Sequence, residues 1–71
     1  ISVFPNPVSE ELFIQLEGEA DIQLIDMNGR VIYSQDKVVS HAVNVNDFTS
    51  GVYLLQIRND DGVHHQRVII D

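Results

Sequence analysis

Apolar and polar side chains alternate along most of this chain, with the period of two that indicates half-buried β-strands. Over residues 11–16, for example, Leu12, Ile14 and Leu16 share one face. Gly18 breaks the pattern after this run, and no segment shows the period of a helix. The alternation predicts strands over residues 1–4, 11–16, 21–27, 30–34, 41–45, 52–58 and 63–70.

These segments amount to about seven short strands joined by turns at intervals of roughly 8–12 residues, which is typical of an all-β sandwich or barrel. An antiparallel sandwich is the better prediction, because two packed sheets bury each other's apolar faces. The chain has 71 residues, the length of one small domain, and we expect residues 1–71 to form it. A chain this short buries only about 60% of its unfolded surface, so its core must be efficient.

The turn after residues 21–27 carries the clearest local signal. Asn28-Gly29 favours a type I′ hairpin turn, in which both central residues have positive φ. Asp26 precedes this turn, where its carboxylate can accept hydrogen bonds from the turn amides or pair with Arg30 across the hairpin. Because residues 21–27 become apolar on both faces, we expect this strand to be central.

A second turn-rich segment ends at Gly51 and leads into another alternating run. Tyr53, Leu55 and Ile57 share one face of this predicted strand, so we expect that face to lie in the core. The Tyr53 hydroxyl is expected to bond a backbone group. Other side chains expected in or near the core are Phe13, Tyr33, Phe48, Val68 and Ile70.

The charge of the chain limits its partners. It carries 11 acidic and 4 basic residues, a net charge of −7, and residues 1–29 contain no Lys or Arg. We therefore expect no nucleic-acid partner, since binding phosphate needs a basic patch. We also expect no membrane insertion, because the apolar runs are far shorter than the roughly 20 residues of a membrane span. A basic protein surface is electrostatically compatible with this chain.

The sequence offers no recognisable enzyme site, because no spacing or elbow motif unites a nucleophile with a base. His64 and His65 are neighbours on a predicted strand and point to opposite faces, so they are poorly placed to chelate one metal ion. Asp60 and Asp61 with Asp71 form an acidic group, for which a solvated hairpin tip is the simpler interpretation. We expect no catalytic, metal or cofactor site.

The sequence begins without Met, and its apolar start over residues 1–4 is too short for a signal peptide. We expect it to be a piece of a longer polypeptide whose export signal lies outside this segment. The absence of Cys fits passage through an oxidising compartment.

Four short motifs occur in a fixed order along the chain. They are Phe4-Pro5-Asn6-Pro7, Asp26-Met27-Asn28-Gly29-Arg30-Val31, Gly51-Val52-Tyr53-Leu54-Leu55-Gln56-Ile57 and Gln66-Arg67-Val68-Ile69-Ile70. Each motif is weak alone, but the whole series resembles the type A C-terminal sorting domain of the type IX secretion system of Bacteroidetes, also called the Por secretion system. The resemblance covers essentially the whole chain.

The resemblance implies an immunoglobulin-like β-sandwich at the C-terminus of a cargo protein, to which it is covalently linked. It implies a secretion and sorting signal that the translocation machinery at the outer membrane recognises. The implied location is secreted or at the cell surface, reached through the periplasm and the outer membrane. In many family members a sortase-like cysteine protease then removes the domain and joins the cargo to surface lipopolysaccharide. Cleavage upstream of Pro-Asn-Pro would fall before or very near Ile1.

Two features depart from the family pattern. Family members often carry Lys in the last strand, where this chain has Arg67, which keeps the charge but not the geometry. They often end in a short basic or apolar tail, whereas this sequence stops at Asp71.

Recognition by the machinery would use surface side chains and an exposed strand edge. The candidate recognition residues are Pro5, Asn6, Pro7, Arg30, Arg67, Val68 and Ile70, and the candidate structural turn residues are Asp26, Asn28, Gly29, Gly51 and Tyr53. For Pro5-Asn6-Pro7, a stiff bend that only ends a strand is the competing interpretation. The alternative function is an immunoglobulin-like binding or spacer module at the cell surface, although few aromatic residues remain for stacking on sugars.

Overall fold

Five β-strands make up the computed structural model, which describes all 71 residues. They are β1 (Ser2–Phe4), β2 (Glu11–Ile25), β3 (Val31–Asn44), β4 (Gly51–Asn59) and β5 (Gly62–Ile70). Every pairing between these strands is antiparallel. The predicted all-β antiparallel class is confirmed, and the structure has no helix long and apolar enough to span a membrane.

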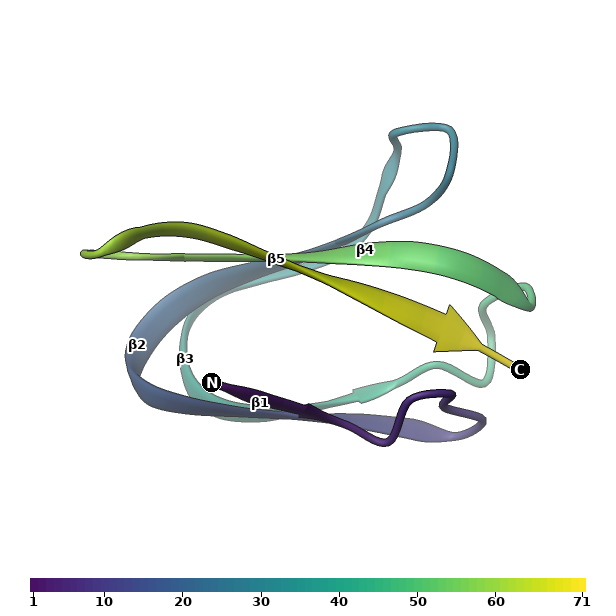
Figure 1. Ribbon diagram of the computed structural model, residues 1–71, viewed down its shortest axis with the longest axis horizontal. Coiled ribbons are helices and arrows are strands. Elements are labelled where there is room, and N and C mark those ends of the chain that lie inside the picture. Colours follow the sequence, from purple (N-terminus) through teal and green to yellow (C-terminus); the bar gives the residue numbers. More distant parts are fainter.

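The strands β2 and β3 are long and bent, and each belongs to two layers. The first half of β2 pairs with β1 and with the second half of β3. The second half of β2 pairs with the first half of β3 and with β4, which in turn pairs with β5. Figure 1 shows β2 leaving the lower layer, curving round at the left and returning in the upper layer. The two layers face each other, as in a β-sandwich of the immunoglobulin-like kind.

The predicted count of about seven strands is wrong, because two pairs of predicted strands are continuous. Residues 11–16 and most of 21–27 lie in β2, and most of residues 30–34 and 41–45 lie in β3. Gly18, which we expected to break the pattern between two strands, lies within β2 and is exposed. The local pattern therefore marks where a strand bends, and the chain keeps its backbone pairing through the bend.

Irregular pairing between β2 and β3 produces the bend. The register shifts between Gln15 and Ala20, and again between Ala20 and Ile22. In β3, Lys37 has a φ of 55°, and its backbone N–H donates to Oδ1 of Asp21 at 2.9 Å. Bulges of this kind bend a strand and increase its twist without ending it. They allow one strand to serve both layers.

The two layers enclose one core that contains no buried charged side chain and whose members are all apolar or aromatic. The buried residues are Val8, Leu12, Ile14, Ala20, Ile22, Leu24, Val38, Val43, Val45, Tyr53, Leu55, Ile57, Val68 and Ile70. The predicted inward faces of residues 11–16 and 52–58 and of the last strand are thus confirmed, with Leu16 half-buried beside them. Tyr33 and Phe48 pack against this core from its margin.

The prediction that Phe13 lies in or near the core is wrong. Its neighbours Leu12 and Ile14 are buried, so strand alternation turns Phe13 to the outer face, where it is 40% exposed. There it packs against Phe4 of the adjacent strand, with the ring centroids 5.7 Å apart. The two aromatic rings cover part of each other's apolar surface across the strands, without being buried in the core.

Candidate functional site

The Pro5-Asn6-Pro7 segment lies against the free edge of β5. The side-chain Nδ2 of Asn6 donates to the carbonyl oxygen of Arg67 at 3.1 Å, and its Oδ1 accepts from the backbone N–H of Ile69 at 3.0 Å. The amide side chain therefore pairs with β5 as a backbone peptide group of a neighbouring strand would. Both bonds preceding the prolines, Phe4-Pro5 and Asn6-Pro7, are cis. The segment does more than end β1, because it joins the start of the chain to its end.

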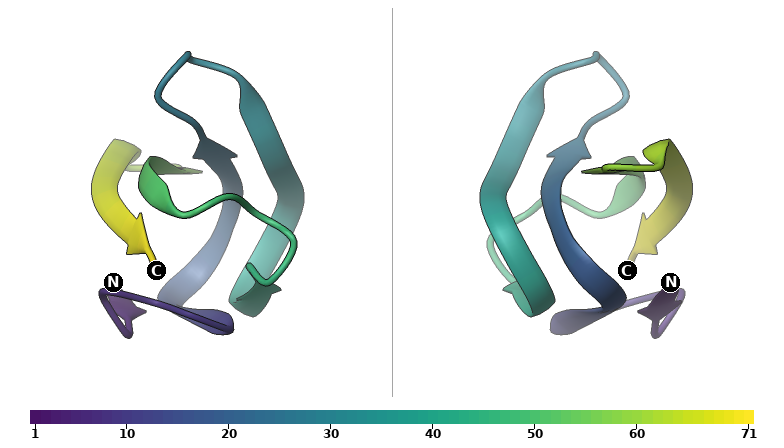
Figure 2. Two further views of the ribbon diagram at one scale, coloured as in Figure 1. Left: turned by 90° about the vertical axis from the view of Figure 1, so that its right-hand side faces the viewer. Right: turned by 90° about the vertical axis from the view of Figure 1, so that its left-hand side faces the viewer.

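Val8 extends this junction. Its backbone N–H donates to the carbonyl of Ile69 and its carbonyl accepts from the N–H of Asp71, both at 2.8 Å. Val8 also forms an isolated parallel bridge with Ile70, and its side chain is fully buried. Together Asn6 and Val8 close the side of the sandwich beside the second half of β5. Figure 2 shows the two ends of the chain on this same side.

The candidates in the last strand divide between the surface and the core. Arg67 is exposed and lies opposite Leu54 of β4, on the outer face of the sheet. Val68 and Ile70 point inward and are buried, with 0% and 2% of their surfaces exposed. Their side chains are therefore not on the surface of the folded domain, because alternation along the strand turns them into the core.

Asp26 organises the turn between β2 and β3. Its Oδ1 accepts from the backbone N–H groups of Asn28 and Arg30, both at 2.9 Å, and its Oδ2 lies 3.2 Å from Nε of Arg30. Asp26 thus makes both interactions that the sequence suggested for it. The hydrogen bond from the Arg30 amide, with further help from Asn28 and the guanidinium, holds the pKa of Asp26 below its ordinary value of 3.8.

The turn is not the predicted type I′ turn. Gly29 has a φ of 85°, but Asn28 does not have positive φ. The Gly29 N–H donates to the carbonyl of Asp26 at 3.0 Å, and the Asp26 N–H donates to the carbonyl of Arg30 at 2.9 Å. This is the bonding of a type I turn followed by a glycine bulge. The carboxylate of Asp26 favours it, because that side chain captures the Asn28 amide.

Gly51 and Tyr53 hold the start of β4. Gly51 has a φ of 156°, a conformation that favours glycine. The hydroxyl of Tyr53 donates to the carbonyl of Thr49, and the ring is buried in the core. The predicted partner of this hydroxyl, a backbone group, is therefore present. These two residues shape the connection from β3 into β4. Tyr53 is buried, so little of its side chain is on the surface.

The structure brings some of the recognition candidates together and separates others. Pro5, Asn6 and Pro7 are exposed and adjoin Arg67 through the Asn6 hydrogen bonds. Arg30 lies in the β2–β3 turn, which projects from the top of the molecule in Figure 1, and its side chain is 76% exposed. The candidates thus form one junction around Asn6 and one separate, projecting turn.

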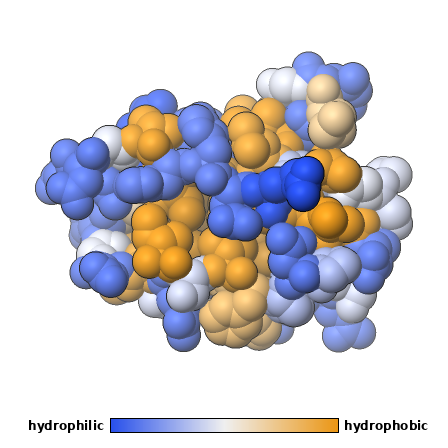
Figure 3. All heavy atoms as spheres, in the orientation of Figure 1, coloured by the Kyte–Doolittle hydropathy of each residue, from blue (hydrophilic) through white to orange (hydrophobic).

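Two surface features were missed in the sequence. The first is the exposed pair of Phe4 and Phe13, which adjoins a shallow hollow that is also lined by Gln15, Ser40 and His41. Knowledge of how β1, β2 and β3 pair would have revealed this cluster, because Phe4 and Phe13 are cross-strand neighbours. The sequence does not contain this information. Apolar side chains also reach the surface on the face where β1 and β5 lie, as Figure 3 shows. Ile1, which precedes β1, and Val63 in β5 are about half exposed.

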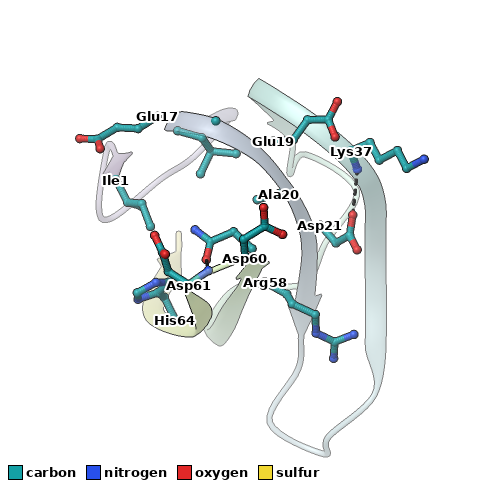
Figure 4. A pocket seen from close by; sticks show the side chains of 13 residues that line it. Ile1, Glu17, Glu19, Ala20, Asp21, Lys37, Arg58, Asp60, Asp61 and His64 are labelled. Atoms are coloured by element: carbon teal, nitrogen blue, oxygen red, sulfur yellow. Dashed lines mark hydrogen bonds between the residues drawn. The ribbon is translucent and has the colours of Figure 1, made fainter.

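The second missed feature is an acidic hollow of about 800 Å³ between the β4–β5 hairpin tip and the bend of β2. Its charged lining comprises Glu17, Glu19, Asp21, Asp60 and Asp61, together with Lys37 and Arg58, and His64 lines it as well. Figure 4 shows Asp60 and Asp61 reaching from the hairpin tip towards β2. Asp71 lies at the opposite end of β5, so the acidic group considered from the sequence does not assemble. No three His, Asp or Glu side chains are placed so that they could hold one metal ion.

Comparison of the sequence with known families shows which family the chain belongs to. The family described as the secretion system C-terminal sorting domain matches residues 2–71. The chain belongs to this family. Its whole length also aligns with an ulvan lyase of Nonlabens ulvanivorans, at 28% identity over 76 residues. It spans only 14% of the length of that relative.

The sorting domain is the C-terminal signal of the type IX secretion system. It is recognised by that system and marks a protein for export across the outer membrane, so that the protein is secreted or placed on the cell surface. A sorting domain is not itself catalytic. The resemblance drawn from the four motifs is therefore confirmed over essentially the whole chain.

Proposed function

We propose that residues 1–71 act as one folded ligand, and that the secretion machinery reads the junction around Asn6. The observation that carries this proposal is the pair of hydrogen bonds from Asn6 to the backbone of Arg67 and Ile69. These bonds unite the first and the last of the four sequence motifs on one exposed surface. This surface forms only when the first and the last motif are packed together. A partner that binds it therefore binds the folded domain in preference to the unfolded chain.

We assign different tasks to the candidate residues. Pro5, Pro7 and Arg67 offer exposed side chains at the junction, and Arg67 supplies a charge that fits a carboxylate of the partner. Arg30 is a second exposed contact on the projecting turn. Val68 and Ile70 act indirectly, because their buried side chains keep the last strand in place.

The remaining partners that we propose are those implied by the resemblance to the family. We propose an upstream cargo domain linked covalently before Ile1, which agrees with the small share of the ulvan lyase that this chain spans. We further propose that a sortase-like protease cleaves before or very near Ile1, where β1 is only three residues long and Ile1 is exposed. Mass spectrometry of the released cargo would detect the new C-terminus, and a cargo that keeps the intact domain on the surface would contradict this step. We propose no enzymatic activity, cofactor or nucleic-acid partner for the domain.

The test is an export assay. A reporter with an export signal is joined to residues 1–71 and expressed in a bacterium with an active type IX system, and its amount outside the cell is measured. We expect export that is lost in a strain lacking the system, and reduced export for Arg67→Ala and Arg30→Ala. Asp36→Ala, an exposed charge far from the junction in sequence, serves as the control. Retention of the unchanged fusion in the periplasm with the domain intact contradicts the proposal.

One observation favours a second role, that of a surface binding module. The rings of Phe4 and Phe13 are exposed together, and Gln15, Ser40 and His41 line the adjoining hollow. Aromatic faces flanked by amide and hydroxyl groups suit stacking on a sugar ring. A glycan array with the wild-type domain and with Phe13→Ala tests this role. A specific signal that Phe13→Ala abolishes supports it, and the absence of any signal removes it.

A further inference from the structure

The two halves of β5 differ in how their outer edge is covered. Four backbone groups that point away from β4 are bonded to Asn6 and Val8: the C=O of Arg67, the N–H and C=O of Ile69 and the N–H of Asp71. Backbone groups alternate in direction along a strand, and the register between β4 and β5 is unbroken from Gly51 to Asn59. The N–H and C=O groups of Val63 and His65 therefore point to the same outer edge. No strand pairs with them there, because β4 is the sole partner of β5.

This open stretch lacks the features that usually protect a sheet edge. Proteins block such edges with proline, lysine, bulges or very short strands. The edge strand β3 carries the bulge at Lys37, and β1 has three residues and is followed by Pro5. Residues 63–66 contain no proline, no lysine and no register shift. Their backbone is therefore ready to accept another strand.

The space beside this stretch is also open towards the other layer. His64 and Gln66 occupy inward-facing positions of β5, as Val68 and Ile70 do, yet both are exposed. Val8 covers the second half of β5, and nothing comparable covers the first half. A strand added at the edge can therefore place every second side chain between the layers without displacing a core residue.

The charge next to the open edge indicates what kind of strand would bind. The acidic hollow begins at the hairpin tip directly before Val63, and its lining holds five carboxylates against one Lys and one Arg. The Asp21 carboxylate already accepts from the backbone of Lys37, and Arg58 lies opposite Asp21 in the neighbouring strand. Asp60 and Asp61, which reach into the hollow, carry the excess charge nearest to β5 (Figure 4). With a net charge of −7, the whole chain attracts a basic partner as well.

We propose that residues 63–66 accept an extended basic segment of the secretion machinery as an added β-strand, with its Lys or Arg side chains in the acidic hollow. This inference rests on the proposed function, because it names the form in which the machinery contacts the domain. The added strand bonds the backbone N–H and C=O groups of Val63 and His65. Main-chain bonding of this kind supplies affinity, and the hollow supplies specificity for charge.

The first experiment tests binding without any secretion. A blocked synthetic peptide of alternating Lys and Thr is titrated into the wild-type domain, with a peptide of alternating Glu and Thr as the control. We expect the amide hydrogens of Val63 and His65 to exchange fast with solvent in the free domain and to become protected by the Lys peptide alone. Protection should weaken with added salt. Binding elsewhere, or no protection of these two amides, overturns the inference.

The second experiment uses a matched pair of variants, His65→Pro and His65→Ala. Both remove the hydrogen bond between the His65 side chain and Gln56, but only proline removes the outward N–H, and it leaves the bonds to β4 intact. We expect His65→Pro to bind the Lys peptide about three- to tenfold more weakly than His65→Ala, as the loss of one hydrogen bond predicts. Equal binding by the two folded variants overturns the inference. If His65→Pro does not fold, the exchange measurement on the wild-type domain decides.

The same pair in the export assay separates the two proposals. Retention of the wild-type fusion in the periplasm contradicts the sorting role itself. The peptide titration still shows whether residues 63–66 bind an added strand. Export of wild type, His65→Ala and His65→Pro in equal amounts leaves the sorting role standing and overturns the added strand. Export of the first two with a loss for His65→Pro supports both proposals.

Discussion

At the scale of single residues, Asp26 shows how one side chain sets the conformation of a turn. Its carboxylate takes the amides of Asn28 and Arg30 and pairs with the guanidinium of Arg30. These bonds form only in the folded hairpin and favour the ionised carboxylate, which lowers its pKa. The folded state therefore binds a proton at Asp26 less readily than the unfolded state does.

This linkage predicts how stability depends on pH. The contribution of Asp26 is fully present above its ordinary pKa of 3.8 and is lost as the pH falls through its lower folded value. At neutral pH, the free energy of unfolding should thus be larger for the wild-type domain than for Asp26→Asn. In acid the two values should become equal. Denaturant unfolding across this pH range measures the difference. Asp36→Asn is the control, and a difference for Asp26→Asn that does not change with pH contradicts the prediction.

Tyr53 is the second residue whose polar end matters for stability. Its ring is buried in the core, and its hydroxyl donates to the carbonyl of Thr49. Tyr53→Phe keeps the ring and removes the hydrogen bond, so we expect a loss of about 1 kcal/mol in the free energy of unfolding. Chemical denaturation measures it. A variant as stable as the wild type would show that solvent replaces this bond at no cost.

At the scale of elements, β5 is held on its two sides by different means. On one side β4 supplies a complete strand. On the other side, along the second half of β5, the Asn6 side chain and the Val8 backbone make the hydrogen bonds that a neighbouring strand would make. The last strand is thus fixed by a segment from the opposite end of the chain. Its first half has no such cover, which is why an added strand is proposed there.

The role of Asn6 leads to a prediction about this element. Asn6→Ala removes both hydrogen bonds to β5, and we expect about 1–2 kcal/mol lower stability and faster exchange of the Ile69 amide. Asn6→Asp keeps the acceptor for Ile69 but loses the donor to Arg67, so it should be intermediate in exchange. Hydrogen exchange followed by NMR measures both variants. Unchanged exchange at Ile69 in Asn6→Ala would mean that the backbone of Val8 alone fixes the strand.

At the scale of the whole molecule, a small core carries the stability. The chain has no disulfide, and its buried residues come from every strand from β2 to β5, together with Val8 and Val45 outside the strands. A domain of this length is expected to be stable by roughly 4 to 11 kcal/mol. Loss of one large buried side chain therefore removes a large share of that stability.

Leu55→Ala tests this dependence, because Leu55 is 1% exposed in the central strand β4. We expect it to lower the free energy of unfolding by about 2–5 kcal/mol and to reduce export, if the machinery reads a folded surface. The neighbouring Leu54→Ala is the control, since Leu54 points outward and is 38% exposed, and it should cost less than about 1 kcal/mol. Normal export of an unfolded Leu55→Ala fusion would show that the signal is a linear sequence.

Most of the inner surface was predictable from the alternation of side chains. Leu12, Ile14, Tyr53, Leu55 and Ile57 were placed on inward faces, and all are buried. Phe13 is the exception among these predictions, because its large aromatic ring lies on the outer face. The alternation itself places Phe13 opposite to Leu12 and Ile14, and the structure follows the alternation.

The sequence by itself determined the all-β class, the inward faces of the strands and the family, because each depends on local pattern and motif order. The tertiary structure alone decided that β2 and β3 continue through their bends, and that Asn6 caps the edge of β5 beside Arg67, 61 positions away. Whether a strand bends or ends depends on its pairing with distant strands, and so does the question of which edges remain free. A period of two within one segment contains no information about those partners.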